Sequence, residues 1–172
     1  MNGAPHEGLV AACIAPTDRI VKLMKRAVRN YLPFEIRELG WAIAEGETDE
    51  YSFQVRFRCF PVDFSKNDYP VRLNVFWAMA RPLEDGLASQ MDIPIMQKFE
   101  ERIVRTSELN GSAILTAVLT GRGEREFVFY ARSADDFLCS LNAIPQEAGR
   151  YPIQIHSSND PDWVYFGSVI RE

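Results

Sequence analysis

The stretch AILTAVLTGRGEREFVFYAR, residues 113–132, decides the fold, because two strand-forming runs flank a glycine-bearing turn in it. The runs AILTAVLT (113–120) and REFVFYAR (125–132) are rich in β-branched and aromatic residues, which favour strands. Gly121 and Gly123 lie between them, and a tight turn needs residues that adopt positive φ at low cost. The sequence therefore predicts a β-hairpin. Since no helix follows GRGE directly, these glycines do not predict a phosphate-binding loop.

Strands and helices alternate on both sides of this hairpin. Upstream, VRLNVFWAM (71–79) alternates as a strand does, and residues 93–108 carry apolar side chains at helical spacing. Downstream, Ser133 is the expected N-cap of a second helix, and YPIQIH (151–156) is the last predicted strand. The order from 70 to 156 is β-α-β-β-α-β. This order predicts an α+β fold with a ferredoxin-like sandwich.

Further elements are predicted before this core. Residues 17–31 form an amphipathic helical pattern, and residues 34–45 and 51–59 are predicted strands. We expect the two extra strands to extend the sheet at an edge, because the core strands occupy its inner positions. The chain is accordingly divided into an N-terminal extension with the amphipathic helix, 1–33, and a single α+β domain, 34–172.

The composition bounds the class of protein. The chain has 172 residues and a formal net charge of −5, which argues against general nucleic-acid binding through a basic surface. No apolar run approaches the roughly 20 residues that a membrane-spanning helix needs, so we expect no membrane partner. The first 16 residues lack the positively charged region of a signal peptide, and we expect a flexible start there. A cytoplasmic location is predicted.

The cysteines are isolated from one another and from the histidines. Cys13, Cys59 and Cys139 form no CxxC motif, which indicates a reducing compartment and buried structural thiols rather than a metal site. His6 and His156 are the only histidines of the chain. We therefore predict neither a metal nor another cofactor.

The strand alternation predicts a polar sheet face opposite the helices. If Phe53, Val55 and Phe57 face the helices together with the apolar residues of the other strands, Arg56 and Arg58 lie on the opposite face. The candidate surface site on that face comprises Arg56, Arg58, Arg72, Asn74, Tyr130 and His156, beside Phe76, Gln154, Glu126, Val128 and Arg132. Arginine forks recognise carboxylates, so we interpret this face as a binding surface for another protein. The alternative is an ordinary solvated sheet face whose arginines pair with nearby acids.

Candidate residues for catalysis are few. In NDPDW (159–163), Asp160 and Asp162 flank a proline beside Trp163, and paired carboxylates can serve acid–base chemistry. Asp-Pro is equally typical of a turn. With Arg125 and Glu126, these residues define a hydrolase as an alternative function. No nucleophile motif is present, so the sequence favours a role without catalysis.

Two further alternatives remain open at the level of the sequence. Single-stranded nucleic acid can bind a sheet face by stacking, with Tyr130 and Phe76 as the platforms, although the acidic balance of the chain counts against this. Homodimerisation through the N-terminal helix is compatible with every function considered. Glu100 and Glu101, in the first predicted core helix, are interpreted as part of its solvated side.

A group of motifs resembles a bacterial family known only as domain of unknown function 695. The motifs are WAIAEGE (41–47), YPVRLNVFW (69–77), FEERI (99–103), LTGRGEREFVFYAR (119–132) and DPDWVYF (160–166). In that family a tryptophan near the start, a Thr-x-x-Gly-x-Arg-Glu-aromatic hairpin and a closing Asp-Pro-x-Trp recur in this order. The resemblance covers roughly 41–170 and implies an α+β fold, with no established activity and no catalytic residues. By analogy with the similar domains of the regulator of ribonuclease activity B, it favours a regulatory, protein-binding role.

Overall fold

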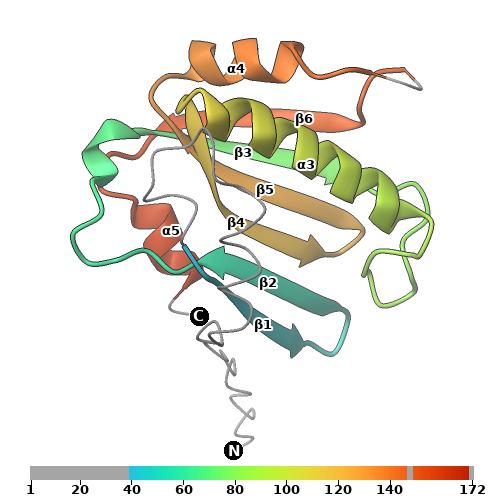
Figure 1. Ribbon diagram of the computed structural model, residues 1–172. Helices are drawn as coiled ribbons and strands as arrows, with labels where there is room; N and C mark the ends of the chain where they lie inside the picture. Colours follow the sequence, from blue (N-terminus) through green and yellow to red (C-terminus); the bar gives the residue numbers. More distant parts are fainter. Residues whose placement is uncertain (1–38, 147–148, 171–172) are drawn as a thin grey trace, which may run out of the picture.

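The computed structural model describes residues 39–146 and 149–170 and contains one antiparallel sheet of six strands with three α-helices (Figure 1). The strands are β1 (Trp41–Glu47), β2 (Ser52–Arg58), β3 (Val71–Ala78), β4 (Ala113–Gly121), β5 (Glu124–Ala131) and β6 (Ile153–Asn159). The helices are α3 (Asp92–Leu109), α4 (Ala134–Asn142) and α5 (Val164–Val169), with a 3₁₀ turn, η1, at Lys66–Asp68. The helix predicted over 17–31 and the start of the strand predicted over 34–45 lie outside the described residues.

The strand order in the sheet is β1-β2-β4-β5-β3-β6, and all neighbours are antiparallel. It follows that β3 and β4 are parallel with β5 between them, and that β5 and β6 are parallel with β3 between them. Helix α3 connects the first of these pairs and α4 connects the second. Strands β1 and β2 extend the sheet beyond β4. The predicted α+β fold is confirmed, and so is the position of the two extra strands at an edge.

The β4–β5 hairpin forms as the sequence predicts, but its two glycines are required for different structural reasons. Arg122 and Gly123 are the two turn residues, with φ angles of 53° and 76°, and a type I′ turn requires positive φ at both positions. Gly121 does not have positive φ. A Cβ atom there would lie 3.1 Å from the carbonyl oxygen of Ser52, so glycine allows β2 to approach β4 closely.

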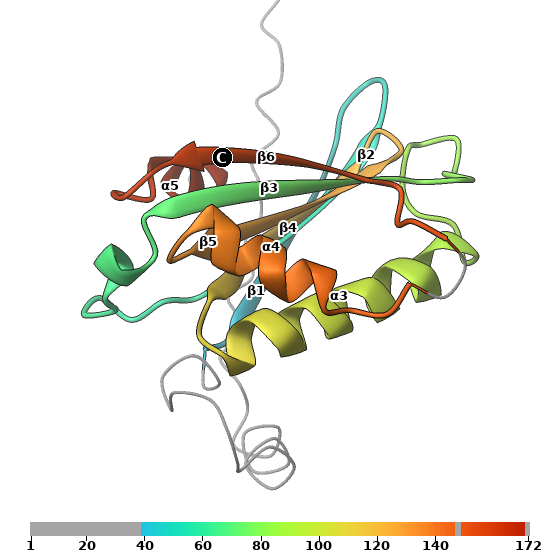
Figure 2. The ribbon, with the colours of Figure 1, turned by 90° about the horizontal axis from the view of Figure 1, so that it is seen from above.

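Helices α3 and α4 cover the same face of the sheet (Figure 2). Phe99 of α3 is the centre of this layer, with its ring centroid 5.2 Å from that of Trp77 in β3 and 5.5 Å from that of Phe127 in β5. Phe137 of α4 lies 4.9 Å from Phe129 in the same way. Such tilted ring pairs add to the free energy gained from apolar burial. This face holds the larger apolar core.

The opposite face carries a second apolar cluster, which the strand alternation does not predict. Trp163, just before α5, stacks on Tyr130 of β5 with a centroid distance of 4.2 Å and an interplanar angle of 21°. Phe166 of α5 is buried in the same cluster with Ile114 and Val128. The prediction of an open polar face is therefore wrong over β4 and β5. The C-terminal apolar segment folds back there and removes these side chains from water.

The side-chain parity predicted for β2 is also wrong. Phe57 packs against the cluster on the α5 side, whereas Arg56 and Arg58 point toward α3. Alternation separates the two sides of a strand but does not say which side meets the helices. Each sheet face has its own apolar cluster, so the aromatic side of β2 can be buried on either face. The arginine side faces α3, where Glu100 and Glu108 accept its hydrogen bonds.

The cysteine prediction is corrected in part. Cys139 lies on the exposed side of α4, and Cys59, after β2, is half-buried. Phe137 and Ser140 are the buried residues of that helix, so position 139 projects outward. Cys13 lies outside the described residues.

Candidate functional site

The predicted surface residues Arg72 on β3 and Tyr130 on β5 contact the turn before α5 and the first turn of that helix. The Tyr130 hydroxyl donates a hydrogen bond to Oδ2 of Asp160 over 2.5 Å. The Arg72 guanidinium carbon lies 4.2 Å from the centroid of the Tyr165 ring, and Nη1 of Arg72 lies 4.0 Å from the same Asp160 oxygen. Tyr130 is fully buried. These side chains hold α5 on the sheet instead of presenting an open platform.

A second polar group lies beside them on the same face. Glu126 Oε1 accepts hydrogen bonds from the Asn74 side-chain amide and from the Tyr165 hydroxyl, the latter over 2.8 Å. His156 on the edge strand β6 remains exposed, with its ring 5.4 Å from that of Phe76. Of the six predicted surface-site residues, the structure brings Arg72, Asn74 and Tyr130 together and leaves His156 at the edge.

The NDPDW motif (159–163) directly precedes helix α5 and caps its first turn. Asp160 accepts hydrogen bonds from the backbone N–H groups of Val164 (2.8 Å) and Tyr165 (3.1 Å), which are unpaired donors of the first turn of α5. The Trp163 indole N–H donates to the Tyr69 carbonyl over 3.0 Å. Asp162 is exposed. The two aspartates therefore form no common site, and the geometry is that of the turn interpretation.

The ionisation of Asp160 follows from these contacts. Burial by itself raises the pKa of this carboxyl, but the Tyr130 hydroxyl, the N–H groups of Val164 and Tyr165 and the charge of Arg72 together bring the pKa below its usual range. For Tyr130, burial and the hydrogen bond to Asp160 raise the pKa above its ordinary value. The pair is thus stable as a carboxylate and a neutral phenol.

Arg58 lies on the helix side in a buried ion pair. Its Nη2 donates to Oε1 of Glu108 in α3 over 2.5 Å, and its Nε donates to the Leu115 carbonyl over 2.8 Å. Both side chains are over nine-tenths buried. Burial raises the pKa of Glu108 despite the opposing charge of Arg58. This pair joins β2, β4 and the end of α3, and its burial excludes it from a surface site.

Arg56 belongs to a more open group of side chains. It donates to Glu100 of α3 and forms an ion pair with it. The guanidinium carbons of Arg56 and Arg58 lie 4.7 Å and 4.9 Å from the ring centroid of Trp41 in β1. Stacked cation–π contacts of this kind fix a guanidinium in one orientation. Glu100 is therefore not simply part of a solvated helix side, in contrast to the prediction.

A polar cavity of about 340 Å³ opens between α3 and strands β2, β4 and β5. Its lining residues are Gln54, Arg56, Gln97, Glu100, Glu101, Val118, Thr120 and Arg125. Val118 is the one apolar side chain among them. The cavity therefore suits a charged or strongly polar group rather than an apolar body.

Arg125 is the most distinctive residue of this cavity. Its Nε donates to the Thr120 hydroxyl over 3.1 Å, across the β4–β5 pair. Within residues 39–146 and 149–170, no carboxylate forms an ion pair with it at 4.0 Å or less. Burial lowers the pKa of Arg125, the charge of Glu100 opposes this, and the charge of Arg56 adds to it. A guanidinium remains protonated even so, which leaves a half-buried positive charge beside the cavity.

The neighbouring predicted residue, Glu126, lies on the other face of the sheet. Successive strand residues point to opposite sides, so Arg125 lines the polar cavity while Glu126 bonds Asn74 and Tyr165 on the α5 side. The two therefore do not form a catalytic pair with each other or with Asp160. Among the described residues, no three His, Cys, Asp or Glu side chains are grouped so as to hold a metal ion.

The residues that sequence reasoning missed are the partners of the arginines. Trp41, Glu100 and Thr120 each contact an arginine at or beside the polar cavity, and all three lie in motifs that carry the family resemblance. The one sequence feature that they share is that they lie in those motifs. Local residue spacing cannot predict that side chains of β1, α3 and β4 meet. None of the helices described here has the length and apolar character needed to cross a membrane.

Comparisons with curated proteins and with solved structures found no match. A scan against protein families matches residues 41–169 to a family of unknown function, DUF695. The matched range begins at the first residue of β1 and ends at the last residue of α5, so it contains the whole sheet and both of its covered faces. The chain therefore belongs to the DUF695 family.

Proposed function

We propose that the protein is a binding module with a regulatory role, and that it takes an acidic side chain of a partner protein at the polar cavity. The observation that carries this proposal is the half-buried guanidinium of Arg125, which lines the cavity with no ion-pair partner among the described residues. A carboxylate entering there gains charge-assisted, two-pronged hydrogen bonds.

The surrounding side chains favour a protein partner. Arg56 brings a second guanidinium to the cavity, and Gln54 and Gln97 are exposed amides at its margin. Glu100 and Glu101 bring negative charge to the same opening. Mixed charges of this kind select a partner that presents complementary groups in a fixed arrangement, and they disfavour a simple polyanion.

The alternatives receive less support. The hydrolase alternative needs Asp160, Asp162, Arg125 and Glu126 in one constellation, and these side chains lie in separate places. Nucleic-acid stacking on Tyr130 requires an exposed ring, whereas that ring is fully buried beneath Trp163. A binding role needs neither arrangement.

The test is a comparison of captured proteins with matched variants. The full chain, Arg125→Gln, Arg125→Lys and the control Arg105→Gln are immobilised and exposed to native lysate, and retained proteins are quantified. Arg105 is exposed on α3 and does not line the cavity, so its variant changes net charge equally. We expect one partner whose retention falls about tenfold or more with Arg125→Gln, partly recovers with Arg125→Lys and is unchanged in the control.

Two outcomes contradict the proposal. One is a set of retained proteins that is the same for Arg125→Gln and the full chain. The other is an equal loss with Arg105→Gln, because it would indicate a general charge effect. Thermal unfolding of every variant shows that retention is compared between folded proteins.

We infer that β3 to β6 with α3 and α4 form a ferredoxin-like sandwich, since the two parallel pairs are interleaved as in a split β-α-β arrangement. We also propose a cytoplasmic location and a homodimer through the predicted helix at 17–31. If so, deletion of residues 1–33 should halve the mass in solution, and an unchanged mass would reject the dimer.

A further inference from the structure

A second cavity of about 460 Å³ lies on the other side of α3. It is bounded by Pro94, Ile95, Lys98, Phe99 and Arg102 of the helix, by the end of β3, and by residues 149–152 before β6. Its volume falls within the range of small-molecule sites, roughly 300–1,000 Å³. The cavity shares no lining residue with the polar cavity, so what it binds is independent of the proposed function.

Three aromatic rings form the inner wall of this second cavity. Trp77 lies 5.2 Å from Phe99 and 5.7 Å from Tyr151, and Phe99 lies 4.9 Å from Tyr151 between ring centroids. Trp77 and Phe99 are also part of the buried core. They are 3% and 0% exposed, so they support the half-buried Tyr151 ring from behind. Tyr151 is therefore the preorganised ring that a ligand can contact.

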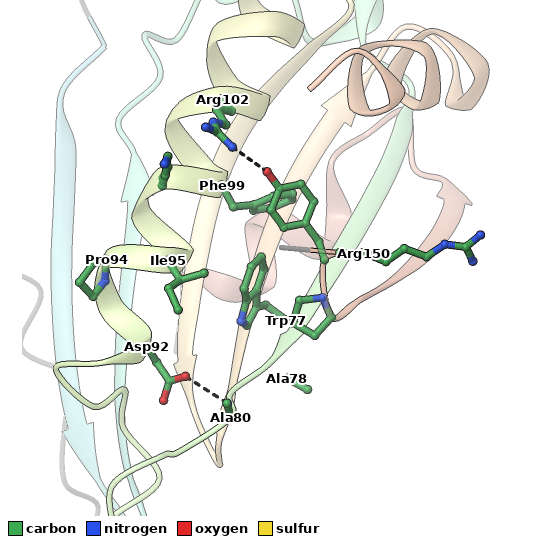
Figure 3. A pocket seen from close by; sticks show the side chains of 13 residues that line it. Trp77, Ala78, Ala80, Asp92, Pro94, Ile95, Phe99, Arg102 and Arg150 are labelled. Atoms are coloured by element: carbon green, nitrogen blue, oxygen red, sulfur yellow. Dashed lines mark hydrogen bonds between the residues drawn. The ribbon is translucent and has the colours of Figure 1, made fainter. Parts of the chain in front are cut away.

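The outer wall is apolar and accessible. Ile95 is 56% exposed at the margin, next to Pro94 (Figure 3). An isoleucine on the exposed side of a helix has no packing role in the core. It can, however, contact a ligand in this cavity. The cavity therefore combines a rigid aromatic wall with an apolar margin.

Charge is distributed unevenly along the cavity. Arg102 lies at one end and Asp92 at the other, with Trp77 between them (Figure 3). Arg102 is fixed by hydrogen bonds from Nη1 to the Tyr151 hydroxyl and to the Pro145 carbonyl, both 3.1 Å. Lys98 also lines the cavity, one helical turn before Arg102, so the part of the α3 wall beyond Asp92 carries positive charge.

The Asp92 carboxylate accepts three hydrogen bonds from the protein itself. It accepts hydrogen bonds from the N–H groups of Ala80 and Arg81, each 3.1 Å, and from the Ser89 hydroxyl, 2.8 Å. These bonds join the start of α3 to the end of β3. The carboxylate is therefore a structural anchor, and its negative charge disfavours an anionic head group at that end.

We propose that this second cavity binds a small amphiphilic anion: a flat apolar body against Tyr151 and Ile95, with a carboxylate toward Arg102 and Lys98. The aromatic wall supplies apolar contact, and the fixed cations decide the orientation and the sign of the head group. The uneven charge distinguishes the site from a nonspecific apolar depression.

The test uses three probes that share one apolar body. Binding of 2-naphthoate, 2-naphthalenemethanol and 2-naphthylmethylamine to the full chain is measured by isothermal titration calorimetry. We expect the carboxylate to bind about tenfold or more tightly than the alcohol, and the amine to bind most weakly. Equal affinities for all three probes, or no binding of the carboxylate, would overturn the proposal.

Variants of residues that line the second cavity test whether the probes bind there. Ile95→Glu puts a negative charge at the margin, so it should weaken the carboxylate about tenfold while sparing the amine. The control Leu109→Glu changes another exposed residue of α3, 41% exposed, which does not line the cavity. Arg102→Gln should also weaken the carboxylate, and Arg102→Lys should retain most of its affinity. A loss with Leu109→Glu equal to that with Ile95→Glu would refute the assignment to this cavity.

Discussion

Arg125 and Glu126 are adjacent in the chain, yet they serve opposite faces of the sheet. Arg125 donates to Thr120 and lines the polar cavity beneath α3, and Glu126 accepts from Asn74 and Tyr165 on the α5 side. One dipeptide thus contributes a cation to the polar cavity and an anion to the contacts that hold the last helix.

The Arg58–Glu108 pair should be a critical point of stability. Replacing Glu108 with Ala leaves the Arg58 guanidinium buried without its counter-ion, which should lower the free energy of unfolding by about 3–5 kcal/mol. Urea unfolding measures the loss. The double variant Arg58→Met/Glu108→Leu removes both charges and should recover much of it. A double variant that is no more stable than Glu108→Ala alone would contradict this account.

The Tyr130–Asp160 contact should give stability a defined acid dependence. The folded pKa of Asp160 lies below its unfolded value, so its stabilisation is present above the unfolded pKa of about 3.9 and is lost as the pH falls through the folded pKa. Asp160→Asn should cost about 1–3 kcal/mol at pH 7, and the difference from the wild type should shrink below pH 4. Urea unfolding from pH 7 to pH 2 checks this. A difference that stays constant with pH would argue against it.

Tyr130 should make the free energy of unfolding fall at alkaline pH. Its folded pKa is raised, so its contribution is present below the unfolded pKa of about 10 and is lost as the pH rises through the folded value. Tyr130→Phe removes the hydroxyl that bonds Asp160 and should flatten the fall in stability above pH 10. The same unfolding titration continued to pH 11 measures this, and an unchanged slope would assign the loss to other groups.

Gly86 should tolerate no side chain. It has a φ of 83°, and a Cβ atom there would lie 2.8 Å from the backbone nitrogen of Arg122 in the β4–β5 turn. Gly86→Ala should therefore lower the free energy of unfolding by at least about 1–2 kcal/mol, the cost of left-handed backbone for a non-glycine residue. Gly40→Ala is the control, since nothing lies within 4 Å of that Cβ position. Equal effects of the two substitutions would show that the close approach is unimportant.

Trp163 should anchor the C-terminal helix. It is 1% exposed and adopts a φ of 55°, a backbone strain that its packing and its bond to Tyr69 help to offset. Trp163→Ala should cost about 3–5 kcal/mol. The adjacent Val164, 69% exposed, provides the control, because Val164→Ala should change stability by no more than about 0.5 kcal/mol. Comparable losses in both variants would contradict the anchor.

The elements that the sequence predicted are those specified locally. The β4–β5 hairpin and helix α3 follow from strand propensity, a positive-φ turn and helical periodicity within a few residues. The N-cap of α4 was predicted at Ser133, and its side chain accepts a hydrogen bond from the backbone N–H of Asp136, three residues away.

The parts that were missed depend on distant partners. The face chosen by Arg56 depends on Glu100, which lies 44 residues away. Helix α5 has only six residues and begins after a tryptophan with positive φ, so neither periodicity nor a usual cap predicts it. The polar cavity is likewise assembled from three strands and a helix, and no single stretch of sequence contains it.

The placement of the three tryptophans gives the protein a built-in set of optical probes. Trp41 stacks on the guanidinium of Arg56 beside the polar cavity, Trp77 lines the apolar cavity, and Trp163 lies beneath α5. Each indole therefore reports on a different region. Variants that retain one tryptophan, with phenylalanine at the other two positions, would let the fluorescence of a single residue follow partner capture, ligand entry or release of the C-terminal helix separately.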